Sequence, residues 1–441
     1  MKILYRIFFF SLAFSASAAI LCGCRYDQDK DGLDDEQDAC VKVAGPSKNQ
    51  GCPIPPEVQR IHLFLDNSAS MAGYYGPATD YKAIVTDLAV KMDREIKAVD
   101  ITLIADETQP FRGSATDLSN AFATTKFSTQ RGSELHKMLT AVAKRAGKRE
   151  VALLVTDGIL SFPDSAILRD REINVNNAKS TLKNDIYAAF SDLRHAGYAA
   201  SLYAFQSKFS GTYYTYQNGH VPLKGEMRPF YLWVIGQQRL LPGFDARLEA
   251  ISSFHPAAVM HFGLTNAALH DYQLLPQVSK LGHWAKADGG IGDVEIIAGQ
   301  PLQAALGIDL GSLPPYARNL SYLRSHIETT CEGCTVTATV VTHAMADSSK
   351  LKTSKQLLAF SRSSHVLLLR VTAMGLPEAS IKLVLPMRYD NWFQAWSTMD
   401  DRDIKSHAAQ TFALEHLVQG VLDAYDTRSK NFIEFNLKLR K

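Results

Sequence analysis

The chain has 441 residues, of which 46% are hydrophobic and 21% are charged, and its formal net charge is +2. This length predicts two or three domains, and the composition is that of an ordinary globular protein. A charge so near zero argues against a nucleic-acid-binding protein. Beyond the N-terminal segment, no apolar run is long enough to span a bilayer.

Residues 1–23 have the pattern of a secretion signal. Lys2 and Arg6 form the positive end, and residues 7–20 form the apolar core. The pattern predicts that this segment is removed during export, so that the mature protein lies outside the cytoplasm.

The signal ends in Leu21-Cys22-Gly23-Cys24, which resembles the bacterial lipobox Leu-x-Gly-Cys. The resemblance implies that Cys24 is lipidated and holds the protein to a membrane without spanning it. Arg25 follows, whereas the inner-membrane retention signal of this class is Asp. The resemblance therefore implies the outer membrane of a Gram-negative cell, on its periplasmic or cell-surface face. Simple cleavage with free secretion is the alternative.

An acidic stretch follows the expected anchor. Against the calcium-loop template, Gly32 takes the sharp turn and the candidate ligands are Asp27, Asp29, Asp31, Leu33 through its carbonyl, Asp35 and Asp38. Asp38 stands where the template has the longer Glu. With Cys40 and Cys52, residues 24–56 resemble one thrombospondin type 3 repeat, which implies bound Ca²⁺. The alternative is an acidic disordered linker.

The cysteine count predicts two disulfides. Once Cys22 leaves with the signal and Cys24 is acylated, four cysteines remain, an even number in an oxidising compartment. Three pairings are possible, and the local ones, Cys40–Cys52 and Cys331–Cys334, are the simplest. The run Cys331-Glu-Gly-Cys334 could also be a redox pair or half a zinc site, but a structural clip at a turn fits better.

Residues 57–260 alternate between strand and helix patterns, which predicts an α/β domain with a mainly parallel sheet and helices on both faces. The expected strands are 60–66, 99–105, 150–156, 199–205 and 230–235, and the expected helices are 80–96, 134–146, 182–196 and 244–254. Between the last two strands, a tyrosine-containing segment predicts an inserted hairpin or loop.

Two of these strands run into polar residues. The first ends in Asp66-Asn-Ser68-Ala-Ser70, and the strand at 150–156 ends in Asp157-Gly158. Ligands bind beyond the carboxyl ends of strands in open α/β sheets, and carboxylates and hydroxyls suit Mg²⁺. The alternative is that Ser68 and Ser70 only bond the backbone of a turn or cap a helix.

These motifs resemble the metal-ion-dependent adhesion site of von Willebrand factor type A domains. The resemblance implies that Asp66, Ser68, Ser70 and Asp157 hold Mg²⁺ or Mn²⁺, with a hydroxyl from a second loop. Ser133 is favoured for that hydroxyl over Thr116, because it directly precedes the helix that leads into the Asp157 strand. The resemblance also implies a protein partner that completes the metal shell with a Glu or Asp carboxylate.

Residues 261–441 are rich in strand patterns, which predict a β-sandwich-like or α+β domain. Strands are expected at 335–341, 365–371 and 381–385, and over 433–439 apolar residues alternate strictly. One helical pattern, from Leu414 to Tyr425, interrupts them. The cluster of Trp392, Phe393 and Trp396 fits a core or domain interface better than a carbohydrate platform.

The sequence predicts a binding protein and not an enzyme, because it contains no His-Glu-x-x-His, no Gly-x-Ser-x-Gly and no P-loop. The favoured function is a lipid-anchored envelope protein that binds a protein partner through the metal. Tyr74 and Tyr75 are expected on the rim of that site. The alternative is an envelope scaffold in which the metal only stabilises the fold and the C-terminal domain makes the contacts.

Overall fold

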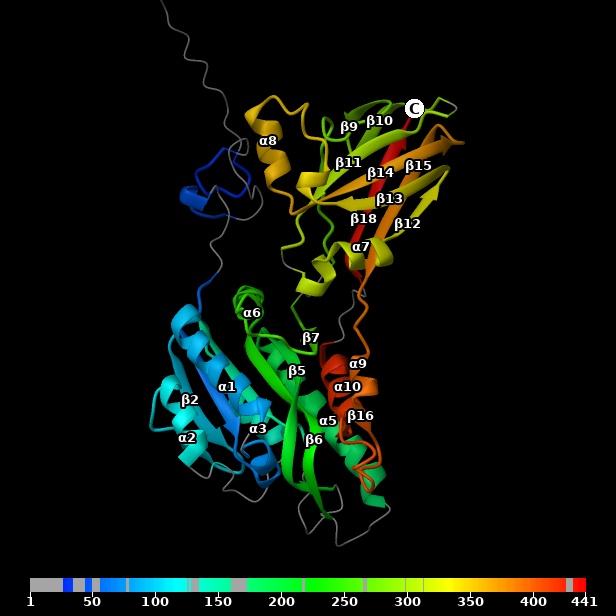
Figure 1. The fold of residues 1–441 in the computed structure, drawn as a ribbon. Helices are drawn as coiled ribbons and strands as arrows, with labels where there is room; N and C mark the ends of the chain where they lie inside the picture. Colours follow the sequence, from blue (N-terminus) through cyan, green and yellow to red (C-terminus); the bar gives the residue numbers. More distant parts are fainter. Residues whose placement is uncertain are drawn as a thin grey trace, which may run out of the picture. The chain divides into compact units, whose positions relative to one another are not determined.

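The computed structural model divides into two compact units, Met1–Ile54 and Pro55–Lys441 (Figure 1). The residues that it describes are 27–34, 44–49, 56–76, 79–124, 127, 135–159, 173–215, 219–264, 268–297, 299–311, 313–425 and 431–441. In the first unit these comprise an acidic turn at 27–34 and a short 3-10 helix, η1 (Ser47–Asn49).

The second unit contains a seven-stranded mixed sheet in the order β3-β2-β1-β4-β6-β5-β7. Its strands are β1 (Arg60–Asp66), β2 (Val99–Ile104), β3 (Thr108–Pro110), β4 (Glu150–Thr156), β5 (Tyr198–Tyr214), β6 (His220–Gln237) and β7 (Ala258–Phe262). β1 is parallel to both β2 and β4, and β6 is antiparallel to β4 and to β5. β1, β2, β4 and β5 therefore run in one direction, and the predicted α/β class is confirmed.

Helices cover both faces of this sheet. In β4, Val151, Leu153 and Val155 pack into one core and the alternate residues Ala152 and Leu154 into another. A strand that is buried on both faces needs an uninterrupted apolar run, which explains its sequence. The first core includes α1 (Asp80–Lys91), α2 (Leu118–Thr124) and α6 (Leu241–Glu249), and the second includes α3 (Leu135–Ala143), α5 (Ile173–His195) and α10 (Leu414–Tyr425). The helix expected over 80–96 is α1 followed by a π-helical turn, η3 (Met92–Ile96).

β5 and β6 form a hairpin much longer than the sheet. Their pairing runs from Tyr198 opposite Gln237 to Tyr214 opposite His220, whereas β4 pairs only with residues 231–235 of β6. The outer part packs closely on the loop after β1: a Cβ on Gly73 would clash with the Phe209 ring, and a Cβ on Gly211 would clash with the Gly73 backbone. Of the hairpin or loop expected from the sequence, the structure has the hairpin, and its outer part packs against the loop after β1.

The β-rich region expected from the sequence is present. Of the two alternatives, β-sandwich-like or α+β, the structure has the first: two sheets pack face to face around one core. One sheet has the order β12-β15-β18-β10-β9 and the other β13-β14-β11-β8. Their bounds are β8 (Gln273–Leu274), β9 (His283–Ala287), β10 (Gly290–Glu295), β11 (Leu302–Ile308), β12 (Glu328–Glu332), β13 (Cys334–Val341), β14 (His365–Met374), β15 (Glu378–Pro386) and β18 (Asn431–Arg440). Two short helices, α7 (Leu320–His326) and α8 (Ser354–Ser361), belong to this region.

A disulfide joins Cys331 to Cys334, with their Cα atoms 5.5 Å apart. Cys331 lies in β12 of one sheet and Cys334 begins β13 of the other, and Gly333 between them has φ +84°. The bond therefore closes the corner at which the chain passes from one sheet of the sandwich to the other. Cys24, Cys40 and Cys52 lie outside the described residues.

Residues 392–425, between β15 and β18, pack on the α/β sheet and not in the sandwich. They comprise α9 (Trp392–Ala395), β16 (Ser397–Thr398), β17 (Thr411–Phe412) and α10. Phe393, Phe412 and Leu417 share a core with Trp233 of β6, and Trp392 Nε1 donates to the Val259 carbonyl (3.2 Å). The helix over 414–425, which the sequence analysis placed in the C-terminal domain, thus contributes to the core of the α/β domain.

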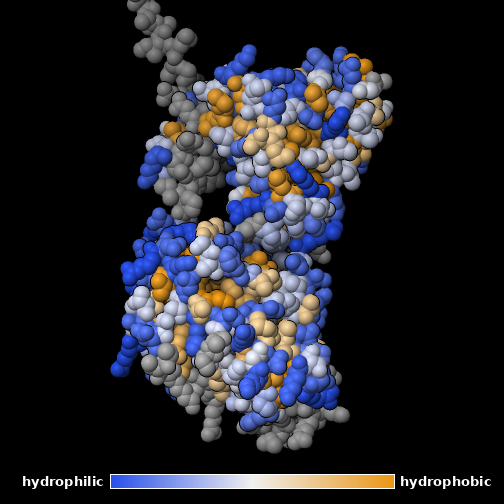
Figure 2. Space-filling view, in the orientation of Figure 1, coloured by the Kyte–Doolittle hydropathy of each residue, from blue (hydrophilic) through white to orange (hydrophobic). Residues whose placement is uncertain are grey.

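The surface view in Figure 2 shows hydrophobic residues interspersed with hydrophilic ones. The exposed large apolar side chains among the described residues include Met227, Met345, Leu357 and Leu376. Scattered exposed apolar residues are normal and mark no binding surface by themselves. In the part of the chain that the structure describes, no helix has the length and apolar character to cross a bilayer.

Candidate metal centre

β1 and β4 bring two carboxylates to the same edge of the sheet. β1 and β4 are parallel, and Leu65 lies opposite Val155. Asp66 at the end of β1 therefore lies beside Thr156 at the end of β4, and Asp157 directly follows Thr156. Asp66 and Asp157 are each only 1% exposed. Their convergence agrees with the rule that parallel strands present their carboxyl ends together.

The loop after β1 adds two hydroxyls. Asp66 Oδ1 accepts a hydrogen bond from the Ser68 amide (2.9 Å), and the hydroxyls of Ser68 and Ser70 lie 3.0 Å apart. Ser68 precedes the 3-10 helix η2 (Ala69–Gly73), but its side chain does not cap that helix. The capping alternative therefore does not account for Ser68, whose hydroxyl faces Ser70.

Thr156 joins the two strand ends. Its hydroxyl donates to Asp66 Oδ2 (2.7 Å) and accepts from the Gly158 amide (3.1 Å). Tyr75 donates to the main-chain oxygen of Asp66 (2.6 Å). Sequence reasoning missed Thr156, although its position directly before Asp157 was a usable signal.

The two carboxylate oxygens of Asp157 differ in their hydrogen bonds. Its Oδ1 accepts from the Ile159 amide (3.1 Å), whereas Oδ2 is buried with no hydrogen-bond partner among the described residues. Gly158 has φ +68°, which lets the chain turn sharply after the carboxylate. A buried carboxylate oxygen without a partner is unfavourable, so this atom needs a cation or a donor.

Burial and mutual repulsion shift the pKa of both acids. Burial, followed by the charge of Asp157, raises the pKa of Asp66 to about 7, against the hydrogen bonds from Ser68 and Thr156. Burial also raises the pKa of Asp157, and the Ile159 amide, the Ser70 hydroxyl and the Arg228 guanidinium oppose this rise. Two adjacent buried carboxylates favour either a shared proton or a bound cation.

The residues present fit a hard divalent cation. Two carboxylates and two hydroxyls supply only oxygen ligands, the type that Mg²⁺ prefers, and Asp157 Oδ2 is the buried atom that a cation would satisfy. Ser133 lies outside the described residues. Thr116 is exposed and shares a hydrogen bond with Ser114 (2.8 Å), and no contact among the described residues joins it to Asp66 or Asp157.

The expectation that Tyr74 lies on the rim is wrong. Tyr74 is fully buried, packs against Phe209 with ring centroids 4.9 Å apart, and donates to the Pro229 carbonyl (2.6 Å). Tyr75 is partly buried and bonds to Asp66. Both tyrosines therefore support the loop after β1, because the long hairpin packs against Tyr74 through Phe209.

A second group of carboxylates lies in the first unit. Asp27, Asp29 and Asp31 place oxygen atoms within 4.8 Å of one another. Asp27 accepts from the amides of Lys30 (2.7 Å) and Gly32 (2.9 Å), and Gly32 has φ +93°. The amide of Leu33 donates to Asp31 Oδ1 (2.8 Å). Asp35 and Asp38 lie outside the described residues.

Asp31→Ala is expected to weaken Ca²⁺ binding at this acidic turn by at least about tenfold, because Asp31 is one of three clustered carboxylates that suit Ca²⁺. Calorimetric titration of the full chain with Ca²⁺ measures the effect, and Asp293→Ala, in β10 of the sandwich, is the control. If the wild-type chain and Asp31→Ala take up Ca²⁺ identically, the turn belongs to an acidic linker.

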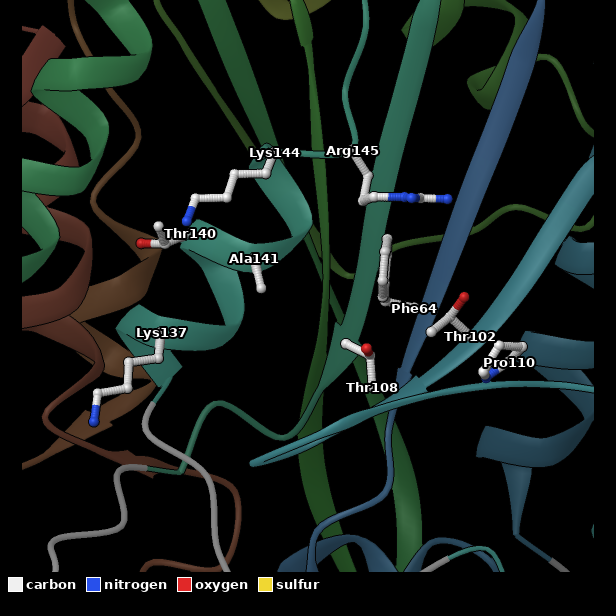
Figure 3. Close-up of a pocket in the computed structure, with 9 residues that line it drawn as sticks. All are labelled: Phe64, Thr102, Thr108, Pro110, Lys137, Thr140, Ala141, Lys144 and Arg145. Carbon is white, nitrogen blue, oxygen red and sulfur yellow. The ribbon is translucent and has the colours of Figure 1, made fainter.

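A separate groove of about 590 Å³ lies between α3 and the neighbouring strands. Figure 3 shows Phe64 between Ala141 of α3 and Thr102 and Thr108, with Arg145 beside it. Lys137 and Lys144 also line the groove. None of the four residues of the metal centre lines it, so the two features are distinct.

No protein-family model and no curated protein matches this chain. Among solved structures, it matches the crystal structure of an aerotolerance-related membrane protein from Bacteroides fragilis NCTC 9343 with multiple mutations to serines, at 14% identity and a TM-score of 0.19. The match covers 32% of this chain and 63% of that one, so the chain spans less than two thirds of the matched protein. Similarity at this level supports no statement about function.

Proposed function

We propose that this protein is a lipid-anchored component of the cell envelope whose α/β domain, similar to von Willebrand factor type A domains, binds a protein partner through Mg²⁺ or Mn²⁺. Asp66, Ser68, Ser70 and Asp157 hold the ion, with Ser133 as the expected hydroxyl from the second loop. The partner offers a Glu or Asp carboxylate.

The observation that carries this proposal is the meeting of Asp66 and Asp157 beside two serine hydroxyls. Both carboxylates are buried, and Asp157 Oδ2 has no hydrogen-bond partner among the described residues. When bound, the ion supplies positive charge and an open coordination position for an incoming carboxylate. The chain's own part is to fix the oxygens: Thr156 and the Ser68 amide orient Asp66, and the Ile159 amide orients Asp157.

One observation favours the second candidate, a scaffold whose metal only stabilises the fold. Ser68 and Ser70 are 3% and 8% exposed, and Asp66 and Asp157 are 1% exposed, so little of the centre is open to a partner. In that case the sandwich makes the envelope contacts. The two candidates share the metal and differ in whether the partner depends on it.

Affinity capture from envelope extract separates the two candidates. The tagged chain is incubated with extract in Mg²⁺ or in chelator, and Asp66→Ala serves as the site variant. Adhesion predicts a partner that is recovered by the wild type in Mg²⁺ and lost both in chelator and with Asp66→Ala. Recovery that is equal in all three samples favours the scaffold.

The lipid anchor gives a second expected result. Cys24→Ala removes the acylated thiol, so the protein is expected to move from the outer-membrane fraction to the soluble periplasm. Ser349→Ala is the control, because this exposed serine lies far along the chain and its substitution leaves the anchor and the disulfide intact. A Cys24→Ala chain that still fractionates with the outer membrane contradicts the lipobox interpretation.

A further inference from the structure

Arg228 is an arginine with no exposed surface beside the proposed metal centre. It lies in β6 one residue before Pro229, whose carbonyl accepts from Tyr74, and three residues before Tyr231, which is opposite Thr156 of β4. Because β6 is antiparallel to β4, Arg228 lies beyond the carboxyl end of β4, next to the loop that carries Asp157. Its charge acts on Asp157 and on Tyr74.

The contacts of Arg228 satisfy little of its hydrogen-bonding capacity. Nη1 donates to the Ala408 carbonyl (3.1 Å), and the guanidinium stacks over the Tyr213 ring at 4.4 Å from its centroid. Nε and Nη2 are buried without hydrogen-bond partners among the described residues. A guanidinium stays protonated, so the fold keeps a full positive charge here. Packing alone does not require this, because a buried charge is more costly than an apolar side chain of similar volume.

A third buried carboxylate contacts the hydroxyl of Tyr213. Asp401 has no exposed surface, and its Oδ2 accepts from the Tyr213 hydroxyl (2.9 Å). Asp401 and Ala408 both belong to the segment between β16 and β17. The charges of Asp401, Arg228 and Asp157 all act on Tyr213, and that of Asp157 acts on Asp66, so this buried group contains three carboxylates and one guanidinium. When all three acids are ionised, two negative charges remain, which is the charge that one divalent cation balances.

We propose that Arg228 sets the charge of the metal centre, and with it the affinity for cations and the preference for divalent over trivalent ions. The inference rests on the proposed metal-binding function. Arg228 partly neutralises Asp157 before an ion arrives, so it lowers the gain from binding one. With Arg228 present, the three ionised carboxylates and the guanidinium carry a net charge of −2, whereas without it the net charge would be −3. Arg228 is thus a specificity-determining residue that touches Tyr213 and the Ala408 carbonyl, not a metal ligand.

The test compares Mg²⁺ and Tb³⁺ binding in variants of the full chain that also carry Asp31→Ala, which weakens the N-terminal cluster. Binding that Asp66→Asn removes is assigned to the centre. Arg228→Gln removes the charge but keeps a donor for the Ala408 carbonyl, and Arg228→Met removes both. Arg228→Lys keeps the charge. Arg402→Met is the matched control, because Arg402 is an exposed arginine in the same segment as Ala408 and pairs with Asp400.

The expected result is that Arg228→Gln and Arg228→Met bind Mg²⁺ about tenfold more tightly than the wild type, and Tb³⁺ by a larger factor, because a nearby positive charge repels a trivalent ion more strongly. Arg228→Lys and Arg402→Met should stay within about twofold of the wild type, since neither changes the charge at the centre. If a neutral variant fails to fold in chelator, Mg²⁺ must restore its folding.

Three results would overturn the inference. In the first, the wild type binds Mg²⁺ and Arg228→Gln binds it equally or less tightly. The proposed metal centre would then stand, and Arg228 would be a packing residue. Another is a neutral variant that is unfolded in chelator and is not rescued by Mg²⁺. The third is the absence of Mg²⁺ and Tb³⁺ binding in every variant including the wild type, which also removes the proposed metal-binding function.

Discussion

In chelator at pH 8, Asp66→Asn is expected to be more stable than the wild type, and Mg²⁺ is expected to stabilise only the wild type. At pH 8 the metal-free wild type holds an ionised Asp66, whose pKa is about 7, buried beside Asp157. The amide removes this charge, and it can still accept from the Ser68 amide through its oxygen and donate to the Thr156 hydroxyl through its nitrogen. An ion that binds only the folded state adds about 2.7 kcal/mol when its concentration is one hundred times the dissociation constant.

Thermal unfolding in Mg²⁺ and in chelator measures both effects. Asp100→Asn is the matched control, because Asp100 is an exposed aspartate in the neighbouring strand β2 and pairs with Arg60. The control should keep the Mg²⁺ response of the wild type. If Asp66→Asn keeps it as well, Asp66 does not belong to a cation site, and the order of stability in chelator then reflects packing alone.

The metal-free protein is expected to lose stability as the pH rises from about 4 to 8. Burial and Asp157 raise the pKa of Asp66 from 3.8 to about 7 in the folded state, so the folded protein holds this proton more tightly than the unfolded chain. The associated stability is fully present below about pH 4 and is lost as the pH rises through about 7. A shift of this size corresponds to on the order of 4 kcal/mol. The pKa of Asp157 is raised too, which adds a loss of the same sign.

Denaturant unfolding of the wild type and Asp66→Asn between pH 4 and pH 8, in chelator, isolates this contribution. The difference between the two stability curves should grow steadily over the window, because all other titrating groups are shared. Mg²⁺ should flatten the wild-type curve, since the ion binds the ionised carboxylates and offsets the loss of the proton. Parallel curves for the two proteins would show that Asp66 titrates as an ordinary exposed acid.

The two strand ends could be predicted from the sequence because their signals are local. The runs of apolar residues before Asp66 and Asp157 predict buried parallel strands. The parallel register of β1 and β4 then brings the ends of these strands together. The alternating pattern of β18 likewise predicted a strand with one buried face, and its residues Ile433, Phe435 and Leu437 lie in the core of the sandwich.

Long-range packing could not be predicted in this way. The placement of β6 between β4 and β5 depends on which strands pair, and no local pattern states that. The apolar face of α10 predicted a helix with one buried side, but it did not identify α5 as the helix that it packs against. Tyr74 follows the site closely in sequence, yet its direction is set by a hairpin that begins more than a hundred residues later.

The charges around the centre were also outside the reach of sequence patterns. Arg228 stands in a polar stretch before an apolar run, and Asp401 stands in the acidic run Asp400-Asp401-Arg402-Asp403. Both resemble solvated surface residues, but the structure buries them completely. Only the meeting of the long hairpin with the segment between β16 and β17 makes them neighbours of the same tyrosine.

Anomalous diffraction from a crystal of the full chain grown in Mn²⁺ can show whether these oxygens hold a cation. We expect one anomalous peak among the oxygens of Asp66, Ser68, Ser70 and Asp157, and no peak there in an Asp66→Asn crystal grown in the same way. A wild-type crystal in millimolar Mn²⁺ with no peak at these oxygens, and with a direct hydrogen bond between the Asp66 and Asp157 carboxyl groups, would contradict the proposed metal centre.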